Sequence, residues 1–241
     1  HQHIFPKFFK FNEDLGSKNI VMKLNNQIIF SIAADGSSAS GKTTGSKFIA
    51  KKFGFKFLSS GKLYRYLAFK VLKNKGKYNS RFISKVANKI TLKKLKSKQL
   101  DSPKVTELSS IISQKKYVRS ALKKFQKDFI KLNNKSICEG RDISTKIHPN
   151  ADLKLFFKCS IKEKAARRLK EFKKLNKNIT RKEVQKALIQ RDLMDTNRKI
   201  SPLIKVKNSV LVDTTNLSIR EMEAKLTKLV SKALKKKYGN L

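Results

Sequence analysis

This chain of 241 residues contains little cysteine, histidine or acid and no tryptophan. Its two cysteines, Cys138 and Cys159, cannot form a disulfide framework, so we expect buried free thiols in a reducing, cytoplasmic compartment. The three histidines, His1, His3 and His148, are scattered, and with the cysteines they show no metal-ligand spacing. No apolar run approaches the ~18 residues that a membrane span needs, so we predict no association with membranes.

Acidic residues are also scarce: 17 Asp and Glu stand against 58 Lys and Arg, for a formal net charge of +41. A dense cationic field attracts nucleic acids and other polyanions. Only ten of the cations are arginine, however, and the lysines are spread along the whole chain. Nor do basic and aromatic residues alternate as in a base-stacking platform. We therefore favour solvated lysine faces over a dedicated nucleic-acid stripe and predict no specific nucleic-acid partner.

Short apolar segments alternate with helical patterns, which predicts an α/β fold with a parallel sheet. Residues 28–34 read as a strand buried on both faces. Further strands are expected at 56–59, 136–138, 153–159 and 209–213. Helices are expected to end at Gly54, to cover 62–75 and most of 76–135, and to start at the capping boxes Thr180/Glu183 and Ser218/Glu221, the last running from about 219 to 236. Residues 1–21 show neither helical nor strand periodicity, and we expect them to form a poorly ordered N-terminal extension.

A glycine-rich segment separates the first predicted strand from the next helix. It reads Gly36-Ser37-Ser38-Ala39-Ser40-Gly41-Lys42-Thr43 and matches the G-x-x-x-x-G-K-[ST] pattern of phosphate-binding loops. Such a loop points successive backbone N–H groups at an anion, and the following helix N-terminus adds its positive end. We expect Lys42 to reach the β and γ phosphates, and the hydroxyl of Thr43 or Thr44 to coordinate Mg²⁺. The loop predicts nucleotide binding, without separating a kinase from an ATPase, a GTPase or a nucleic-acid motor.

Arginine is scarce enough for its placement to be informative. Arg65, Arg141, Arg191 and Arg198 lie in compact polar clusters. A guanidinium group recognises phosphate or carboxylate in a bidentate way that an ammonium group cannot reproduce. Arg191 and Arg198 are seven residues apart, about two helical turns, so we expect them on one helix face with Asp195 between them.

Taken together, these motifs resemble those of the cytidylate kinases of bacterial type, members of the nucleoside-monophosphate kinase family. The resemblance runs from about residue 22 to the end of the chain. It rests on Asp35-Gly36 with the phosphate loop, Ser60-Gly61 with Tyr64-Arg65, Gly140-Arg141-Asp142, Pro149-Asn150-Ala151-Asp152, the 191–198 block with Ser201-Pro202-Leu203, and Asp213-Thr214-Thr215 with Leu217-Ser218-Ile219. The Gly-Arg-Asp and 191–198 blocks are far more specific than the loop.

The resemblance implies a core of P-loop NTPase type, with a five-stranded parallel sheet flanked by helices, formed by residues 22–75 and 130–241. A nucleoside-monophosphate-binding region would be inserted at 76–129, and a short helical lid would span about 176–204. The implied reaction is Mg²⁺-dependent transfer of the γ-phosphoryl group of ATP to CMP or dCMP, giving ADP and CDP or dCDP. We expect a monomer whose partners are these small nucleotides.

Matching positions imply an acceptor site that includes Ser60, Arg65, Ser110, Arg119, Arg141, Asp142, Arg191 and Arg198. Three of them offer donors and acceptors suited to the cytosine edge, namely Ser110, Arg119 and Asp142. The arginines at 65, 191 and 198 suit the monophosphate or the transferring group, with Asp195 orienting the guanidinium groups. No side-chain base is required, because the attacking phosphate oxygen is already anionic, and catalysis would come from alignment and charge neutralisation. Two roles remain possible for Arg167 and Arg168: they support the lid, or they contact ATP.

The chain departs from the family pattern at several positions. Ser59 stands where the family has Asp, Ser37 where it has Pro, and Glu139 where it often has Asp; Glu139 could still hold Mg²⁺ through water. The inserted region is short, with little room for the family's antiparallel hairpins, which leaves CMP, dCMP and UMP open as acceptors. The competing readings are a P-loop kinase of another nucleotide or small acceptor, and an RNA-binding P-loop ATPase.

Overall fold

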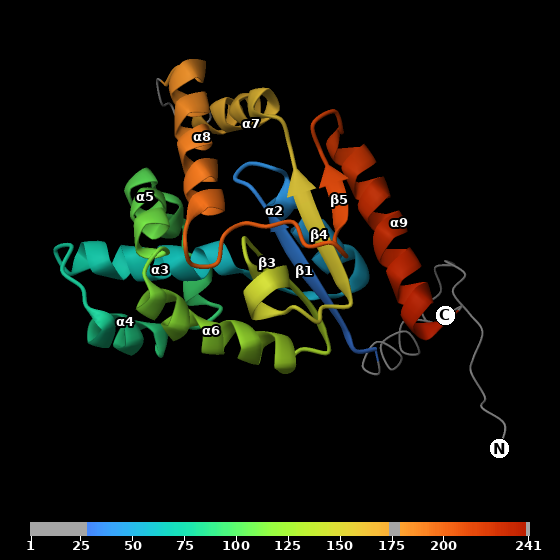
Figure 1. Ribbon diagram of the computed structural model, residues 1–241, viewed down its shortest axis with the longest axis horizontal. Helices are drawn as coiled ribbons and strands as arrows, with labels where there is room; N and C mark the ends of the chain where they lie inside the picture. Colours follow the sequence, from blue (N-terminus) through green and yellow to red (C-terminus); the bar gives the residue numbers. More distant parts are fainter. Residues whose placement is uncertain (1–27, 174–178, 240–241) are drawn as a thin grey trace.

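The computed structural model describes residues 28–173 and 179–239. The expected N-terminal extension, residues 22–27 of the expected core and residues 176–178 of the expected lid lie outside these ranges. The described residues form one sheet of five parallel strands in the order β2-β3-β1-β4-β5 (Figure 1). The strands are β1 (Phe30–Gly36), β2 (Lys56–Ser59), β3 (Lys135–Gly140), β4 (Leu153–Lys158) and β5 (Val210–Asp213). The predicted α/β fold with a five-stranded parallel sheet is therefore confirmed.

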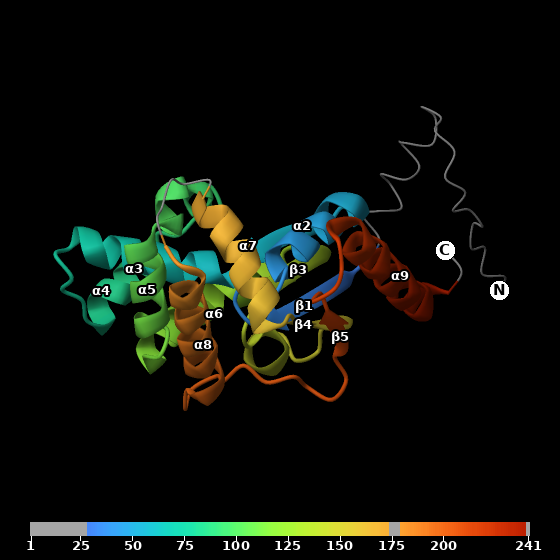
Figure 2. The same ribbon diagram turned by 90° about the horizontal axis from the view of Figure 1, so that it is seen from above.

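Helices cover both faces of this sheet, as the two sides of β1 show. Phe30, Ile32 and Ala34 belong to one apolar cluster, together with residues of α2 (Lys42–Phe53) and α9 (Ile219–Tyr238). Ala33 points the other way, into a cluster shared with α3 (Ser60–Lys73) and α6 (Lys116–Lys131). Side chains alternate between the two faces of a strand, so a strand covered on both sides is mainly apolar on both faces, as β1 is from Ile32 to Ala34. Figure 2 shows the sheet between these helical layers.

Several helix boundaries follow from local sequence signals. Gly54 ends α2 in the left-handed conformation with φ of 70°, where a side chain would be strained. Complete capping boxes start α8 (Arg181–Asn197) and α9, pairing Thr180 with Glu183 and Ser218 with Glu221. The predictions for these three boundaries are confirmed.

The segment between α3 and β3 contains helices and no strand. After α3 come α4 (Ser80–Ala87), the short 3₁₀ turns η1 (Lys94–Lys96) and η2 (Lys98–Asp101), α5 (Pro103–Ile112) and α6. Ser102 caps α5 by accepting the N–H of Val105, with Pro103 at the first helical position. Helices α4, α5 and α6 pack their apolar faces on α3 in one continuous cluster, so this helical segment is anchored to the core through α3.

Helices α7 (Ile161–Lys173) and α8 pack together above the carboxyl ends of the strands (Figure 1). Their shared cluster contains the buried Ala165, Val184 and Leu188, and Ala39 of the glycine-rich loop packs against it. In open parallel sheets, ligands bind at this edge, outside the carboxyl ends of the strands. In the described part of the chain, no helix is long and apolar enough to cross a membrane.

Candidate active site

The loop between β1 and α2 has the conformation that its glycines permit. Gly36 has φ of 155°, and a Cβ atom there would lie 2.4 Å from the carbonyl oxygen of Phe157 on β4. Gly41, with φ of 78°, is the residue that precedes α2. The hydroxyl of Ser40 donates to the carbonyl of Ser37 at 2.9 Å, and that of Thr214 donates to the carbonyl of Ser40 at 3.0 Å. These hydrogen bonds fix the conformation of the loop, and α2 starts at the residue that follows Gly41.

Lys42 and Thr43, the first two residues of α2, both contact the buried carboxylate of Glu139 at the end of β3. The Lys42 ammonium lies 3.3 Å from Oε2 of Glu139, and the Thr43 hydroxyl lies 2.8 Å from the same oxygen. Burial lowers the pKa of Lys42, against the opposing effect of Glu139. Burial by itself raises the pKa of Glu139, but the charge of Lys42 and hydrogen bonds from Ser59 and Thr43 bring it below its usual value. Ser59, where the family has Asp, therefore supports this carboxylate.

The hydroxyl and carboxylate oxygens of Thr43 and Glu139 are the hard ligands that Mg²⁺ accepts. Among the described residues, no group of three or more His, Cys, Asp or Glu side chains could hold a metal without further ligands. This sparse set fits Mg²⁺, which commonly keeps several waters and binds through one or two protein oxygens plus substrate phosphates.

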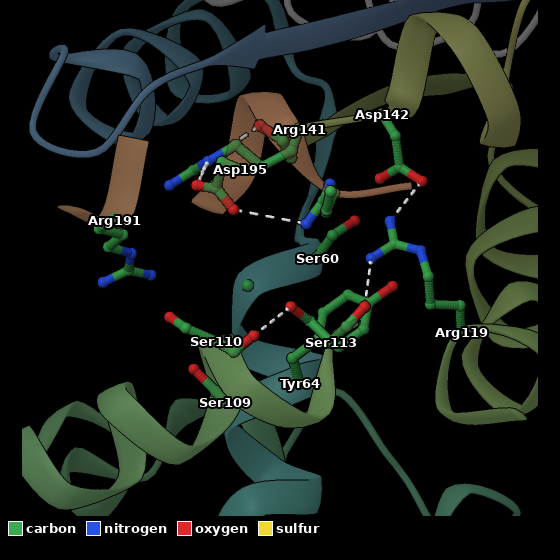
Figure 3. Close-up of a pocket in the computed structure, with 13 residues that line it drawn as sticks. Ser60, Tyr64, Ser109, Ser110, Ser113, Arg119, Arg141, Asp142, Arg191 and Asp195 are labelled. Carbon is green, nitrogen blue, oxygen red and sulfur yellow. Dashed lines mark hydrogen bonds and ion pairs between the residues drawn. The ribbon is translucent and has the colours of Figure 1, made fainter. Parts of the chain in front are cut away.

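A polar pocket lies where α3, α5, α6, β3 and α8 meet. Figure 3 shows serine, arginine and aspartate side chains from these elements around the opening. Its lining comprises Ser60, Gly61, Tyr64, Ser109, Ser110, Ser113, Arg119, Gly140, Arg141, Asp142, Arg191, Asp195 and Arg198. Seven of the eight residues predicted for the acceptor site are therefore brought together.

The eighth, Arg65, does not line the pocket. Its guanidinium pairs with Asp101 at 2.6 Å, and the same carboxylate accepts from Lys62. Burial lowers the pKa of Arg65, while Asp101 opposes this effect. On α7, Arg167 donates to Thr214 beside the phosphate loop, whereas Arg168 pairs with a glutamate on its own helix.

The inner wall of the pocket is a buried ion pair between Arg119 and Asp142, 2.6 Å apart (Figure 3). Arg119 also donates to the carbonyl of Ser113 at 2.9 Å and lies over the ring of Tyr64. Asp142 is positioned by the turn after β3, because the buried carboxylate of Asp35 accepts the next two backbone N–H groups. Burial raises the pKa of Asp35, against those hydrogen bonds.

The wall nearest the phosphate loop is a network centred on Asp195. Its carboxylate accepts from Arg141 at 2.7 Å and lies 3.4 Å from Arg198. Arg141 also donates to the hydroxyl of Ser38 in the loop at 3.0 Å. Burial raises the pKa of Asp195, but the charge of Arg141 and its hydrogen bond more than offset this, so the net shift is downward.

Arg191 differs from these arginines because its buried Nε has no hydrogen-bond partner, as is also true of one terminal nitrogen of Arg198. Burial, together with the nearby charge of Arg141, lowers the pKa of Arg191 to about 10. A buried cation with an unpaired hydrogen-bond donor costs free energy unless an anion accepts that hydrogen bond. The pocket is therefore built to receive a negatively charged group.

The helix that carries Arg191 ends earlier than the spacing of Arg191 and Arg198 suggested. We expected Arg191 and Arg198 on one helical face, but α8 ends at Asn197 and Arg198 is extended, with its Nε donating to the carbonyl of Ser201. Pro202 follows and cannot continue a helix. Both arginines nevertheless line the pocket.

Several pocket residues were not among the predictions. Tyr64 lies one helical turn after Ser60, and Ser109 and Ser113 are likewise one turn apart on α5, so helical spacing was the available signal. Gln126 donates to the hydroxyl of Ser60 at 2.7 Å from the buried face of α6, and nothing in the sequence marks it.

Comparison with known proteins gives consistent matches. The sequence model of one protein family, described as cytidylate kinase, matches residues 32–232. A cytidylate kinase of Thermotoga neapolitana is 35% identical over 221 residues, covering 86% of this chain and 99% of that protein. One of Fusobacterium nucleatum is 34% identical over 212 residues, covering 83% and 97%, and one of Clostridium tetani is 32% identical over 221 residues, covering 87% and 97%.

Proposed function

The chain belongs to the cytidylate kinase family, and we propose that it transfers the γ-phosphoryl group of ATP to CMP or dCMP, giving ADP and CDP or dCDP. The observation that carries this proposal is the unpartnered, buried Nε of Arg191 in a pocket beside a phosphate loop. An anionic phosphoryl acceptor bound there would accept the unpaired hydrogen bond of Arg191 and would lie next to the donor phosphates.

The two nucleotides would occupy adjoining sites, because Arg141 of the pocket donates to Ser38 of the phosphate loop. ATP phosphates would lie on residues 36–44, with Lys42 turning from Glu139 toward the β and γ phosphates. Thr43 and Glu139 would hold Mg²⁺, which would neutralise negative charge on the donor phosphates. The acceptor monophosphate would lie against Arg191 and Arg198. Arg65 would leave its ion pair with Asp101 and contact the same phosphate.

The reaction needs no side-chain base. A phosphate oxygen of the acceptor forms the new bond to the γ-phosphorus of ATP, and the bond from that phosphorus to the bridging oxygen breaks as ADP leaves. Lys42, Arg191 and Arg198 offset the charge that spreads over the transferring group. Asp195 keeps the guanidinium groups of Arg141 and Arg198 directed at the pocket.

The buried pair of Arg119 and Asp142 would select the base. Cytosine offers an amino donor and adjacent ring acceptors, which match a carboxylate and a guanidinium held side by side. Uracil has a carbonyl oxygen in place of the amino group. The carboxylate of Asp142 would then face another hydrogen-bond acceptor, and no hydrogen bond could form between them. A buried polar group left unpaired costs ~1–3 kcal/mol, which supports preference for cytosine over uracil.

We extend the proposal to organisation and setting. The core, the inserted region 76–129 and the lid at about 176–204 would act together, because residues of α3, α5, α6 and α8 line the same pocket. Two buried free cysteines fit a reducing cytoplasm. Gel filtration with light scattering tests the expected monomer.

An acceptor panel tests the function. With ATP and Mg²⁺, ADP formation is measured for CMP, dCMP, UMP, AMP and shikimate. We expect turnover with CMP and dCMP, and at least tenfold less with UMP. No ADP formation with CMP or dCMP would overturn the proposal. Turnover with another member of the panel would instead favour a kinase of that acceptor, and RNA-stimulated ATP hydrolysis would favour the RNA-binding ATPase.

A further inference from the structure

A buried lysine outside the pocket contacts the phosphate loop through a single carboxylate. Lys164 lies in the first turn of α7 and is only 6% exposed. Its ammonium lies 2.6 Å from Oδ2 of Asp192 on α8. The other carboxylate oxygen, Oδ1, accepts the backbone N–H of Ser38 at 3.2 Å. Asp192 thus joins α7, α8 and the loop at one point.

The same region of the loop is also held by apolar packing. Ala39, the residue after Ser38, packs against the cluster that α7 and α8 share through Ala165, Val184 and Leu188. Moving these two helices would therefore shift the loop, and their polar connection to it through Asp192 depends on Lys164.

Asp192 also places a negative charge beside a loop that must bind a polyanion. The ammonium of Lys164 compensates that charge, and it fixes the carboxylate so that Oδ1 faces Ser38. Without the ammonium, a carboxylate left with only the charge of Arg141 nearby would repel donor phosphates, and its side chain, 22% exposed, could rotate toward water. Both effects weaken donor binding.

We infer that Lys164 is a positioning residue for the phosphate donor: acting through Asp192, it holds the phosphate loop in register with α8. The inference rests on the proposed function only in taking ATP as the donor. Lys164 itself lies outside the pocket that would take the acceptor, so we expect its main effect on binding of the donor.

The test compares Lys164→Met with Lys164→Arg and, as a matched control, Lys162→Met, which changes an exposed lysine in the same turn of α7. The Michaelis constants for ATP and CMP are measured, together with the dissociation constant of a non-hydrolysable ATP analogue by calorimetry. Lys164→Met should weaken ATP and analogue binding about tenfold and change the Michaelis constant for CMP by less than about twofold. Lys164→Arg and Lys162→Met should stay within about threefold of the parent protein.

A second variant identifies Asp192 as the intermediary. Asparagine keeps an oxygen for the Ser38 N–H but carries no charge, so Lys164→Met with Asp192→Asn should recover most of the lost analogue affinity. A double variant that binds the analogue as weakly as Lys164→Met, or more weakly, would overturn the inference. So would equal changes in both Michaelis constants, or a lowered melting temperature with unchanged donor binding. If Lys164→Met does not fold, Lys164→Gln takes its place.

The analogue titration also separates this inference from the proposed function. A parent protein that binds the analogue but makes no CDP refutes the choice of acceptor, whereas the effect of Lys164 on analogue binding remains measurable. A parent protein that makes CDP, with a Lys164→Met variant that binds the analogue normally, refutes the inference alone.

Discussion

Replacing Arg119 by methionine tests the buried pair that forms the inner wall of the pocket. The side chains of Arg119 and Asp142 are 9% and 6% exposed, and their charged atoms are 2.6 Å apart. Removing one partner of such a pair costs about 3–5 kcal/mol, because the remaining charge is left buried and unpaired. Arg198 also interacts with Asp142 and partly compensates it, so we expect the lower figure, about 3 kcal/mol.

For a chain of this size, ~3 kcal/mol corresponds to a fall in melting temperature of about 6–12 °C. The matched control is Lys124→Met on the same helix, which breaks an exposed pair with Asp128 at 2.5 Å. Such a surface pair contributes about 0.3–0.5 kcal/mol, or a fall of ~1–2 °C. Thermal unfolding followed by circular dichroism measures both.

The double variant Arg119→Met with Asp142→Asn separates the orphaned charge from lost packing. Removing the remaining charge should restore more than half of the lost stability, while turnover with CMP should stay low because both base-facing groups are gone. If Arg119→Met lowers the melting temperature no more than Lys124→Met does, the ion pair does not stabilise the fold as argued. If the double variant keeps the parent's preference for CMP over UMP, the pair does not select the base.

Three further changes test other parts of the structure. Lys42→Ala and Arg198→Ala should each lower turnover by a factor on the order of 10³ in a coupled ADP assay, and near-normal rates would contradict their assigned roles. The folded-state pKa of Asp195 lies below its usual value, so its contribution to stability is present at neutral pH and lost as the pH falls below about 5. In urea titrations, Asp195→Asn should therefore show a weaker fall in unfolding free energy between pH 6 and pH 3.5, and an unchanged slope would refute this. Ser218→Ala removes the cap of α9 and should cost about 1 kcal/mol in the same titration, whereas Ser218→Asp, which can still cap the helix, should cost less than half of that.

Local signals were sufficient for most of the fold. Strands at the centre of a parallel sheet are apolar on both faces, so the segment at 28–34 was recognisable, and the observed β1 begins and ends two residues later. Gly54 and the two capping boxes mark helix ends through interactions between residues close in the chain. The phosphate loop was equally predictable, since its glycines are required by backbone conformation rather than by distant partners.

Long-range contacts were not predictable in this way. The position of Asp101 as a partner of Arg65 depends on how η2 packs against α3, which no local pattern specifies. Gln126 and Lys164 belong to helices with ordinary polar sequences, and their roles come from the neighbours that they meet after folding. The end of α8 before Arg198 likewise depends on how the chain continues through Ser201 and Pro202.

The sequence by itself determined the class of fold and the phosphate loop, because short motifs and hydrophobic periods encode them directly, and its resemblance to the family implied most of the pocket residues. Scarcity was informative there: with only ten arginines and 17 acidic residues, the Arg141 and Arg191 blocks stood out against a background of lysine. Only the tertiary structure decided which of these charges pair and which stay free. Whether a charge is compensated depends on distance and burial, and both are set by elements that are remote in the chain. That is why the unpartnered Nε of Arg191 and the bridge from Lys164 through Asp192 to Ser38 appear only in the folded protein.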